Sequence, residues 1–93
     1  MYFIYDAAKN QSNASKHGIS LEEARNLWQD EHLVEVAARH RAEKRRLVIA
    51  KRDGAYWSAI ITYRGSAIRI ISARRSTEKE KRLYDKTRQH NHR

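Results

Sequence analysis

The second half of the chain alternates extended segments with short turn signals, and this pattern leaves few possible folds. Residues 33–38, 46–51, 55–63 and 66–73 are rich in Val, Ile, Tyr and Trp. Asp53-Gly54 and Arg64-Gly65 stand between the last three segments, and such glycine-containing pairs are typical of hairpin turns. The sequence therefore predicts an antiparallel meander of three strands, with residues 33–38 as a fourth strand.

The two faces of this sheet differ if each turn contains two residues, because side chains alternate along a strand. The expected core face contains Val48, Ala50, Trp57, Ala59, Ile61, Tyr63, Ile68 and Ile70. The opposite face contains Leu47, Ile49, Tyr56, Ile60 and Ile71, together with Lys51, Thr62, Arg69 and Arg75. Three coverings of this second face stay open: a helix of the same chain, a protein partner, or RNA with Tyr56 stacked on a base.

Signals for one short strand and two helices precede these four strands. Residues 2–5 predict a short strand, after which Asp6 can cap a helix over residues 7–17 that Gly18 ends. Ser20 and Glu23 form a capping box for a second helix. Its apolar stripe contains Leu21, Ala24, Leu27 and Trp28. We interpret Trp28 as a core residue rather than a residue that stacks on bases.

A third helix is expected after the strands, from Thr77 to about Lys86, with Thr77 and Glu80 as its capping box. Tyr84 can either anchor this helix on the sheet or contact RNA, and anchoring fits the pattern better. The predicted fold class is α+β, with two N-terminal helices, an antiparallel sheet of three to four strands plus a short N-terminal strand, and a C-terminal helix. A chain of 93 residues can enclose one core, so residues 1–93 are expected to form a single domain, with 89–93 as a frayed tail.

The charge of the chain indicates a polyanionic partner. There are 20 Lys and Arg against 11 Asp and Glu, a formal net charge of +9. Because the basic residues are spread over several elements, nucleic acid is favoured over a membrane, while an acidic protein partner fits equally well. The chain has no cysteine for a thiol nucleophile or a disulfide, and no signal peptide is evident, so a cytoplasmic location is expected. We expect no metal and no cofactor.

Arg74 and Arg75 are the clearest candidates for binding phosphate. They end the last predicted strand, and a guanidinium group matches phosphate in shape and charge. The alternative is that both are solvated residues at a strand end, and this segment alone favours that alternative.

Further motifs follow one another in a specific order along the chain. They are Phe3-Ile-Tyr-Asp6, Lys9, Asn13, Lys16-His-Gly18, Ser20-Leu-Glu-Glu-Ala24, Asp30, His40, Glu43, Arg45, Tyr63-Arg-Gly65, Ile68-Arg-Ile-Ile-Ser-Ala-Arg-Arg75, Glu80, Arg82 and Tyr84. In this order the chain resembles the BrnT family of bacterial ribonuclease toxins. The resemblance implies a RelE-like fold, RNA cleavage without a metal, and neutralisation by a BrnA-like antitoxin. It also implies that promoter DNA is bound only through the antitoxin, whose complex with the toxin represses their own promoter.

The resemblance also raises the weight of particular residues. Arg64, Arg74 and Arg75 become candidate binders of the phosphate and of the transition state, and Glu43 or His17 becomes the candidate for proton transfer. The candidate RNA-binding residues are Lys16, Arg69, Tyr84 and Tyr56.

Each catalytic assignment has a structural alternative. Arg64 can be an ordinary turn residue, and His17 and Lys16 can interact with the end of their helix. Glu43 can form a surface ion pair. The alternative function is a non-catalytic basic protein that binds nucleic acid or supports a repressor complex.

Overall fold

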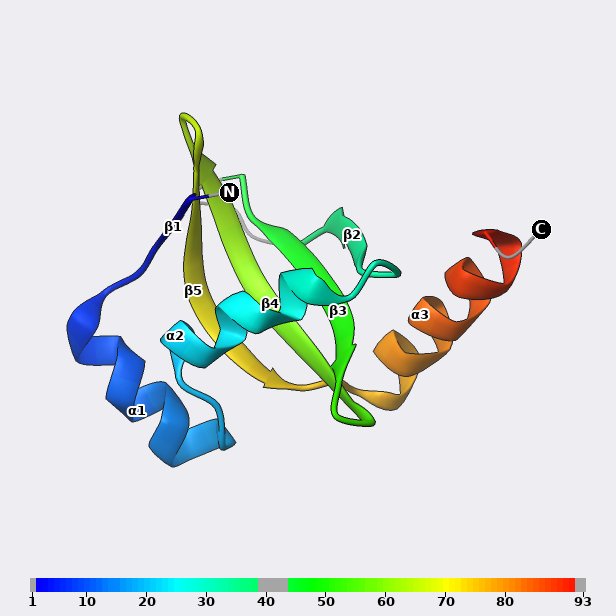
Figure 1. The fold of residues 1–93 in the computed structure, drawn as a ribbon, viewed down its shortest axis with the longest axis horizontal. Helices are drawn as coiled ribbons and strands as arrows, with labels where there is room; N and C mark the ends of the chain where they lie inside the picture. The colour runs from blue at the N-terminus through cyan, green and yellow to red at the C-terminus, as the bar shows by residue number, and fades with distance from the viewer. Residues whose placement is uncertain (1, 39–43, 92–93) are drawn as a thin grey trace.

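Five strands form one mixed sheet in the computed structural model, which describes residues 2–38 and 44–91. The strands are β1 (Tyr2–Ile4), β2 (Val34–Ala37), β3 (Arg46–Arg52), β4 (Ala55–Arg64) and β5 (Ala67–Arg75). Their order across the sheet is β1-β5-β4-β3-β2 (Figure 1). Strands β2 to β5 are antiparallel, as predicted, and β1 adds a parallel pair with β5 that makes the sheet mixed.

The first hairpin has the predicted turn and register. Asp53 and Gly54 have φ angles of 52° and 79°, so both adopt the left-handed conformation of a two-residue hairpin turn. In the second hairpin the turn is Gly65-Ser66, one residue later than expected, and Arg64 is the last residue of β4. Because the turn is one residue later, each β4 residue next to it pairs with a β5 residue two positions further along than expected. A shift of two residues keeps the same side chains on the same face of the sheet.

The predicted core face is confirmed. Val48, Ala50, Ala59, Ile61, Ile68 and Ile70 are buried with Leu21, Ala24 and Leu27, and Trp28 and Trp57 pack against them. Tyr63 lies on the same face but beyond the cover of the helices, and half of its surface is exposed. The opposite face carries a smaller cluster of Val34, Ile49 and Tyr84. A helix of the same chain therefore covers part of that face, which was the first of the three coverings left open.

An irregularity in β5 corrects the predicted position of Arg75. Ile60 pairs with Ser72, but Ile61 pairs with Ile70, so Ile71 is an extra residue between them. Such a β-bulge reverses the alternation of all residues beyond it. As a result Arg75 pairs with Trp57 on the core face, and the prediction that it lies on the opposite face is wrong.

The helices begin where their capping residues predict. Helix α1 (Ala7–His17) starts after Asp6 and ends at Gly18, whose φ is 80°. Helix α2 (Leu21–Ala24) has the Ser20 and Glu23 capping box and continues as the 3-10 helix η1 (Arg25–Gln29). Helix α3 (Glu78–Asn91) extends beyond the expected end at Lys86 and into the segment expected to be frayed. In the part of the chain that the structure describes, no helix is long and apolar enough to cross a membrane.

Candidate functional site

A basic depression lies between α1 and β5, and we call it the α1-β5 groove. It comprises two adjoining cavities of about 110 Å³ and about 370 Å³ that share Lys9, Arg45 and Ile71. The first cavity is also lined by Asp6, Arg64, Arg69 and Ile70. The second is also lined by Ser12, Asn13, Lys16, His17 and Ser72. The groove thus brings together four of the predicted site residues, which are His17, Lys16, Arg64 and Arg69.

Helix α1 presents its polar side chains to the groove because of their spacing. Lys9, Ser12, Asn13 and Lys16 are three or four residues apart, which places them on one face of a helix. Only Asn13 among them is buried. Both lysines are exposed. On this face of α1, Asn13 therefore packs against the protein, and Lys9 and Lys16 line the groove.

Asn13 attaches α1 to the edge of β5. Its Nδ2 donates to the carbonyl oxygen of Ala73 at 2.8 Å and to that of Ile19 at 2.7 Å. Its Oδ1 accepts from the backbone N–H of Ala73 at 3.3 Å. The side-chain amide thus makes hydrogen bonds to both backbone groups of Ala73, as a neighbouring strand would. The strand β1 is too short to reach this position.

The sheet positions the arginines on the other side of the groove. Arg69 pairs with Thr62 across β4 and β5, and Arg64 ends β4 at the hairpin. The hydroxyl of Thr62 donates to the carbonyl oxygen of Lys44 at 3.1 Å, which holds the backbone next to Arg45. Three guanidinium groups are therefore mounted on regular strands or on backbone fixed to them.

The lining of the groove is strongly positive. Of the residues that the structure describes, five lysines and arginines line it, and Asp6 is the carboxylate in that lining. That carboxylate caps α1, since its Oδ1 accepts from the N–H of Ala8 at 2.8 Å and from that of Lys9 at 3.4 Å. Cations concentrated in a concave site attract phosphate and stabilise negative charge that develops on it.

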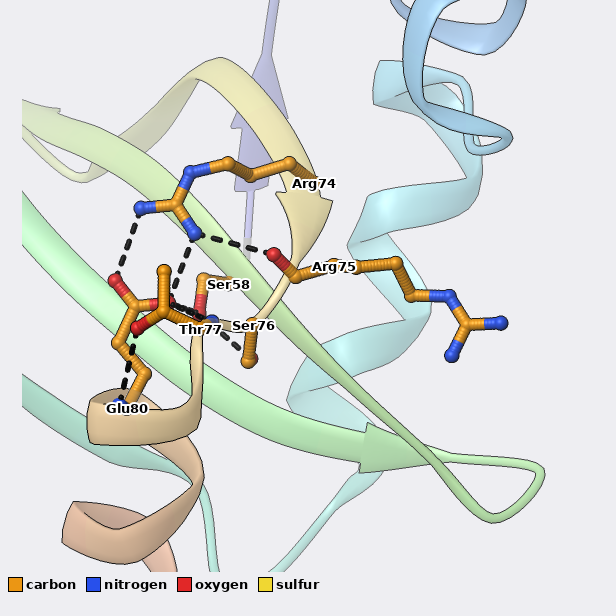
Figure 2. Close-up of polar contacts among 6 residues, drawn as sticks. All are labelled: Ser58, Arg74, Arg75, Ser76, Thr77 and Glu80. Atoms are coloured by element: carbon orange, nitrogen blue, oxygen red, sulfur yellow. Dashed lines mark hydrogen bonds and ion pairs between the residues drawn. The ribbon is translucent and has the colours of Figure 1, made fainter.

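Arg74 lies outside this groove, in a polar cluster at the start of α3 (Figure 2). Its Nη1 donates to Oε1 of Glu80 at 2.8 Å, and its Nη2 donates to Oε2 at 2.9 Å. The same carboxylate accepts from the Ser58 hydroxyl at 2.8 Å and from the Thr77 N–H at 2.9 Å. The Arg74 guanidinium and the two other donors lower the pKa of Glu80 from 4.5 to about 2 although the carboxyl is largely buried. We call this set the Arg74-Glu80 clamp.

Arg75 points away from the clamp (Figure 2). It is exposed, and its guanidinium carbon lies 4.9 Å from the centre of the Trp57 ring. The adjacent arginines therefore do not form a pair, because successive residues of a strand point to opposite faces.

A family model described as "Ribonuclease toxin, BrnT, of type II toxin-antitoxin system" matches residues 5–80. The chain belongs to this BrnT family. It is accordingly a type II toxin-antitoxin ribonuclease toxin, and the family implies an RNA substrate and a protein antitoxin as partner. No curated protein sequence matches the chain. The match includes every residue that lines the α1-β5 groove, so the groove belongs to the part of the chain that carries the BrnT signature.

Tyr84 and Tyr56 occupy a different region, between α3 and the sheet. Tyr84 is 1 % exposed, and its hydroxyl donates to Oδ2 of Asp30 at 2.7 Å. Its ring meets that of Tyr56 edge to face, with centroids 5.7 Å apart, and the Tyr56 hydroxyl donates to Asp85 at 2.8 Å. A ring as buried as that of Tyr84 is unable to stack on a base, so its position matches the anchoring interpretation.

Asp30 completes this anchor. Burial opposes its ionisation, but hydrogen bonds from the N–H groups of Lys51 and His32 and from the Tyr84 hydroxyl outweigh burial and lower its pKa. Burial and the bond to Asp30 raise the pKa of Tyr84. The pair therefore keeps a protonated donor and an ionised acceptor around neutral pH.

The remaining candidate, Glu43, falls outside the described residues. Sequence reasoning missed Lys9, Ser12, Asn13, Arg45 and Ser72 as groove residues. For Lys9, Ser12 and Asn13 the signal was the three- and four-residue spacing of polar side chains on a helix with few apolar ones. Arg45 and Ser72 lie outside that helix and carried no such signal. Among the described residues no group of three His, Cys, Asp or Glu side chains could hold a metal ion.

Proposed function

We propose that this BrnT-family toxin is a metal-independent endoribonuclease that binds the RNA backbone in the α1-β5 groove. The observation that carries the proposal is the convergence of Lys9, Lys16, Arg45, Arg64 and Arg69 on one concave surface. The carboxylate in its lining already caps a helix. A phosphodiester is the ligand that this arrangement of cations fits best.

The reaction needs two proton transfers and stabilisation of a crowded phosphate. The 2′-oxygen attacks phosphorus as its proton passes to a base, and the P–O5′ bond breaks as the leaving oxygen receives a proton. The products are a 2′,3′-cyclic phosphate and a 5′-hydroxyl. His17, which lines the groove, is the proposed proton-transfer group within the described residues, and Glu43 remains the second candidate. Arg69 and Arg64 are proposed to hold the phosphate, with Lys9 and Lys16 alongside.

The two adjacent arginines receive different roles in this proposal. Arg74 is engaged by Glu80, so we propose that it supports the fold next to the site rather than contacting RNA. Arg75, on Trp57, is proposed to contact RNA outside the groove.

The proposal extends to the regulation that the family resemblance implies. A BrnA-like antitoxin neutralises the toxin, and the complex represses its own promoter with the antitoxin alone contacting DNA. The net charge of +9 supports an antitoxin with an acidic binding surface. A RelE-like fold and a cytoplasmic location complete this picture.

The test is cleavage of a defined single-stranded RNA by purified protein, in chelator and in magnesium. We expect equal cleavage in both, with 2′,3′-cyclic phosphate ends. Arg69→Ala should lower the rate by about 10²- to 10³-fold, the loss seen when one pre-placed charge donor is removed. Lys79→Ala is the matched control, since Lys79 is an exposed cation on α3 away from the groove.

Three results would overturn parts of this proposal. Cleavage only with magnesium would refute metal independence. Equal activity of Arg69→Ala and Lys79→Ala would remove the groove from the mechanism. Folded wild-type protein that binds RNA without cleaving it would favour the non-catalytic alternative.

A further inference from the structure

One exposed aromatic residue, Tyr2, lies on strand β1, which pairs with the strand that carries Arg69 of the groove. Among the large hydrophobic side chains that the structure describes, the exposed ones are Tyr2, at 64 %, and Tyr63, at 50 %. The Tyr63 hydroxyl donates to Oε1 of Glu35 at 2.7 Å on the core face of the sheet. Tyr2 precedes the residues that the family model matches. The sequence pattern gives it only a place in the first predicted strand.

Strand pairing places Tyr2 on the face that carries the arginines of the groove. Tyr2 is opposite Ala67, and Ala67 is opposite Arg64, so these three residues form one row across the sheet. Ile4, Arg69 and Thr62 form the next row on the same face, since side chains two residues apart point the same way. Tyr2 and both arginines therefore project from one side of the sheet, where β1 runs beside β5 (Figure 1).

The spacing suits a ring and a cation that bind the same RNA strand. Neighbouring strands are about 4.8 Å apart and residues rise about 3.3 Å each, so the Tyr2 and Arg69 Cα atoms are roughly 8 Å apart. The Cα atom of Arg64 is roughly 10 Å from that of Tyr2 by the same geometry. Side chains of these lengths can engage a phosphate and an adjacent base.

We infer that Tyr2 forms a nucleobase-stacking subsite at the β1 end of the α1-β5 groove, next to the phosphate held by Arg64 and Arg69. This inference rests on the proposed function, because it requires RNA in the groove. Stacking on an exposed tyrosine needs no particular base, so the subsite would favour unpaired nucleotides without reading their sequence. Base-paired RNA would be unable to use it.

The test is binding of a single-stranded 2′-O-methylated oligonucleotide, which lacks the attacking hydroxyl and stays intact. Stacking of one base is worth roughly 1–3 kcal/mol, so Tyr2→Ala should weaken binding by about 5- to 150-fold. Tyr2→Phe should bind like the wild type. Tyr63→Ala is the matched control, because Tyr63 is also exposed but lies on the core face, away from Tyr2. Tyr2→Leu keeps an apolar strand residue without an aromatic face and should lose affinity as Tyr2→Ala does.

An abasic scan locates the stacked base. Removing the base at one position should weaken binding to the wild type, and the same removal should cost Tyr2→Ala nothing more, because both changes delete one contact. Equal affinity of Tyr2→Ala, Tyr2→Leu and the wild type, with Arg69→Ala still weakened, would overturn this inference and leave the proposed function standing. Failure of the wild type to bind any RNA would overturn both.

Discussion

Replacing Glu80 by Gln tests whether the Arg74-Glu80 clamp stabilises the fold. Glu80→Gln keeps the shape of the side chain but removes its charge, so the bidentate ion pair of 2.8 and 2.9 Å is lost. The side chain of Glu80 is 13 % exposed and that of Arg74 is 37 % exposed, so solvent screens this pair only in part. We expect a lower free energy of unfolding around neutral pH.

The magnitude follows from the pKa of Glu80. The carboxyl has a pKa of about 2 in the folded protein against a usual value of 4.5. One pKa unit corresponds to about 1.4 kcal/mol, so the whole pKa shift would add roughly 3 kcal/mol to the free energy of unfolding. That amount includes the Ser58 and Thr77 hydrogen bonds, and the exposure of Arg74 reduces the ionic part. A loss of about 1–2 kcal/mol is therefore the expected cost of Glu80→Gln.

The pH dependence gives the decisive measurement. Because the pKa of Glu80 is lowered on folding, its stabilisation is present above pH 4.5 and is lost as pH falls toward 2. Urea unfolding of the wild type and of Glu80→Gln should differ most near about pH 7, and by about pH 3 more than half of the difference should be gone. Gln resembles the protonated carboxyl, so the two proteins converge in acid.

Glu78→Gln is the matched control for this experiment. Glu78 stands two residues before Glu80 on α3, is 78 % exposed, and pairs with Lys81 at 3.0 Å. An exposed pair of this kind contributes about 0.5 kcal/mol or less. If Glu80→Gln cost no more than Glu78→Gln, or if its cost stayed constant from neutral pH to acid, the clamp would not stabilise the fold.

Three further substitutions test the other contacts by urea unfolding. Tyr84→Phe should cost about 2 kcal/mol because Asp30 loses a buried hydrogen bond to its charged group, and a cost below that of a surface change would contradict the anchor. Asn13→Ala should cost about 2–4 kcal/mol because it leaves both backbone groups of Ala73 unsatisfied, and unchanged stability would show that water replaces the amide. Arg75→Ala should cost less than about 1 kcal/mol, since an exposed cation over a ring contributes little, and a larger loss would assign it a structural role.

The sheet was predictable because local signals agree with one another. Asp53-Gly54 determines the register of the first hairpin, and alternation then assigns Val48, Ala59 and Ile61 to the core face. The capping residues marked where α1 and α2 begin. These features depend on neighbouring residues in the chain, so periodicity and turn chemistry suffice to find them.

The groove was only partly predictable because it depends on contacts between distant residues. Arg64, Arg69, Lys16 and His17 were candidates, but their convergence requires α1 to pack along β5. Asn13 fixes that packing through Ala73, which is 60 positions away, and nothing local to a single asparagine shows such a partner. The partner of Arg74 was equally hidden, although Glu80 had been predicted as a helix cap and serves as one.

The bulge at Ile71 explains why Arg74 and Arg75 each lie on the face of the sheet opposite to the one that alternation predicts. Without the extra residue, Arg75 would lie on the face of Arg69 and Arg74 on the core face. With it, Arg74 reaches Glu80 at the start of α3, and Arg75 lies over Trp57. The bulge also places Ile71 in both cavities of the groove. One inserted residue thus directs Arg74 to Glu80, and under the proposed function it leaves the scissile phosphate to the cations between α1 and β5.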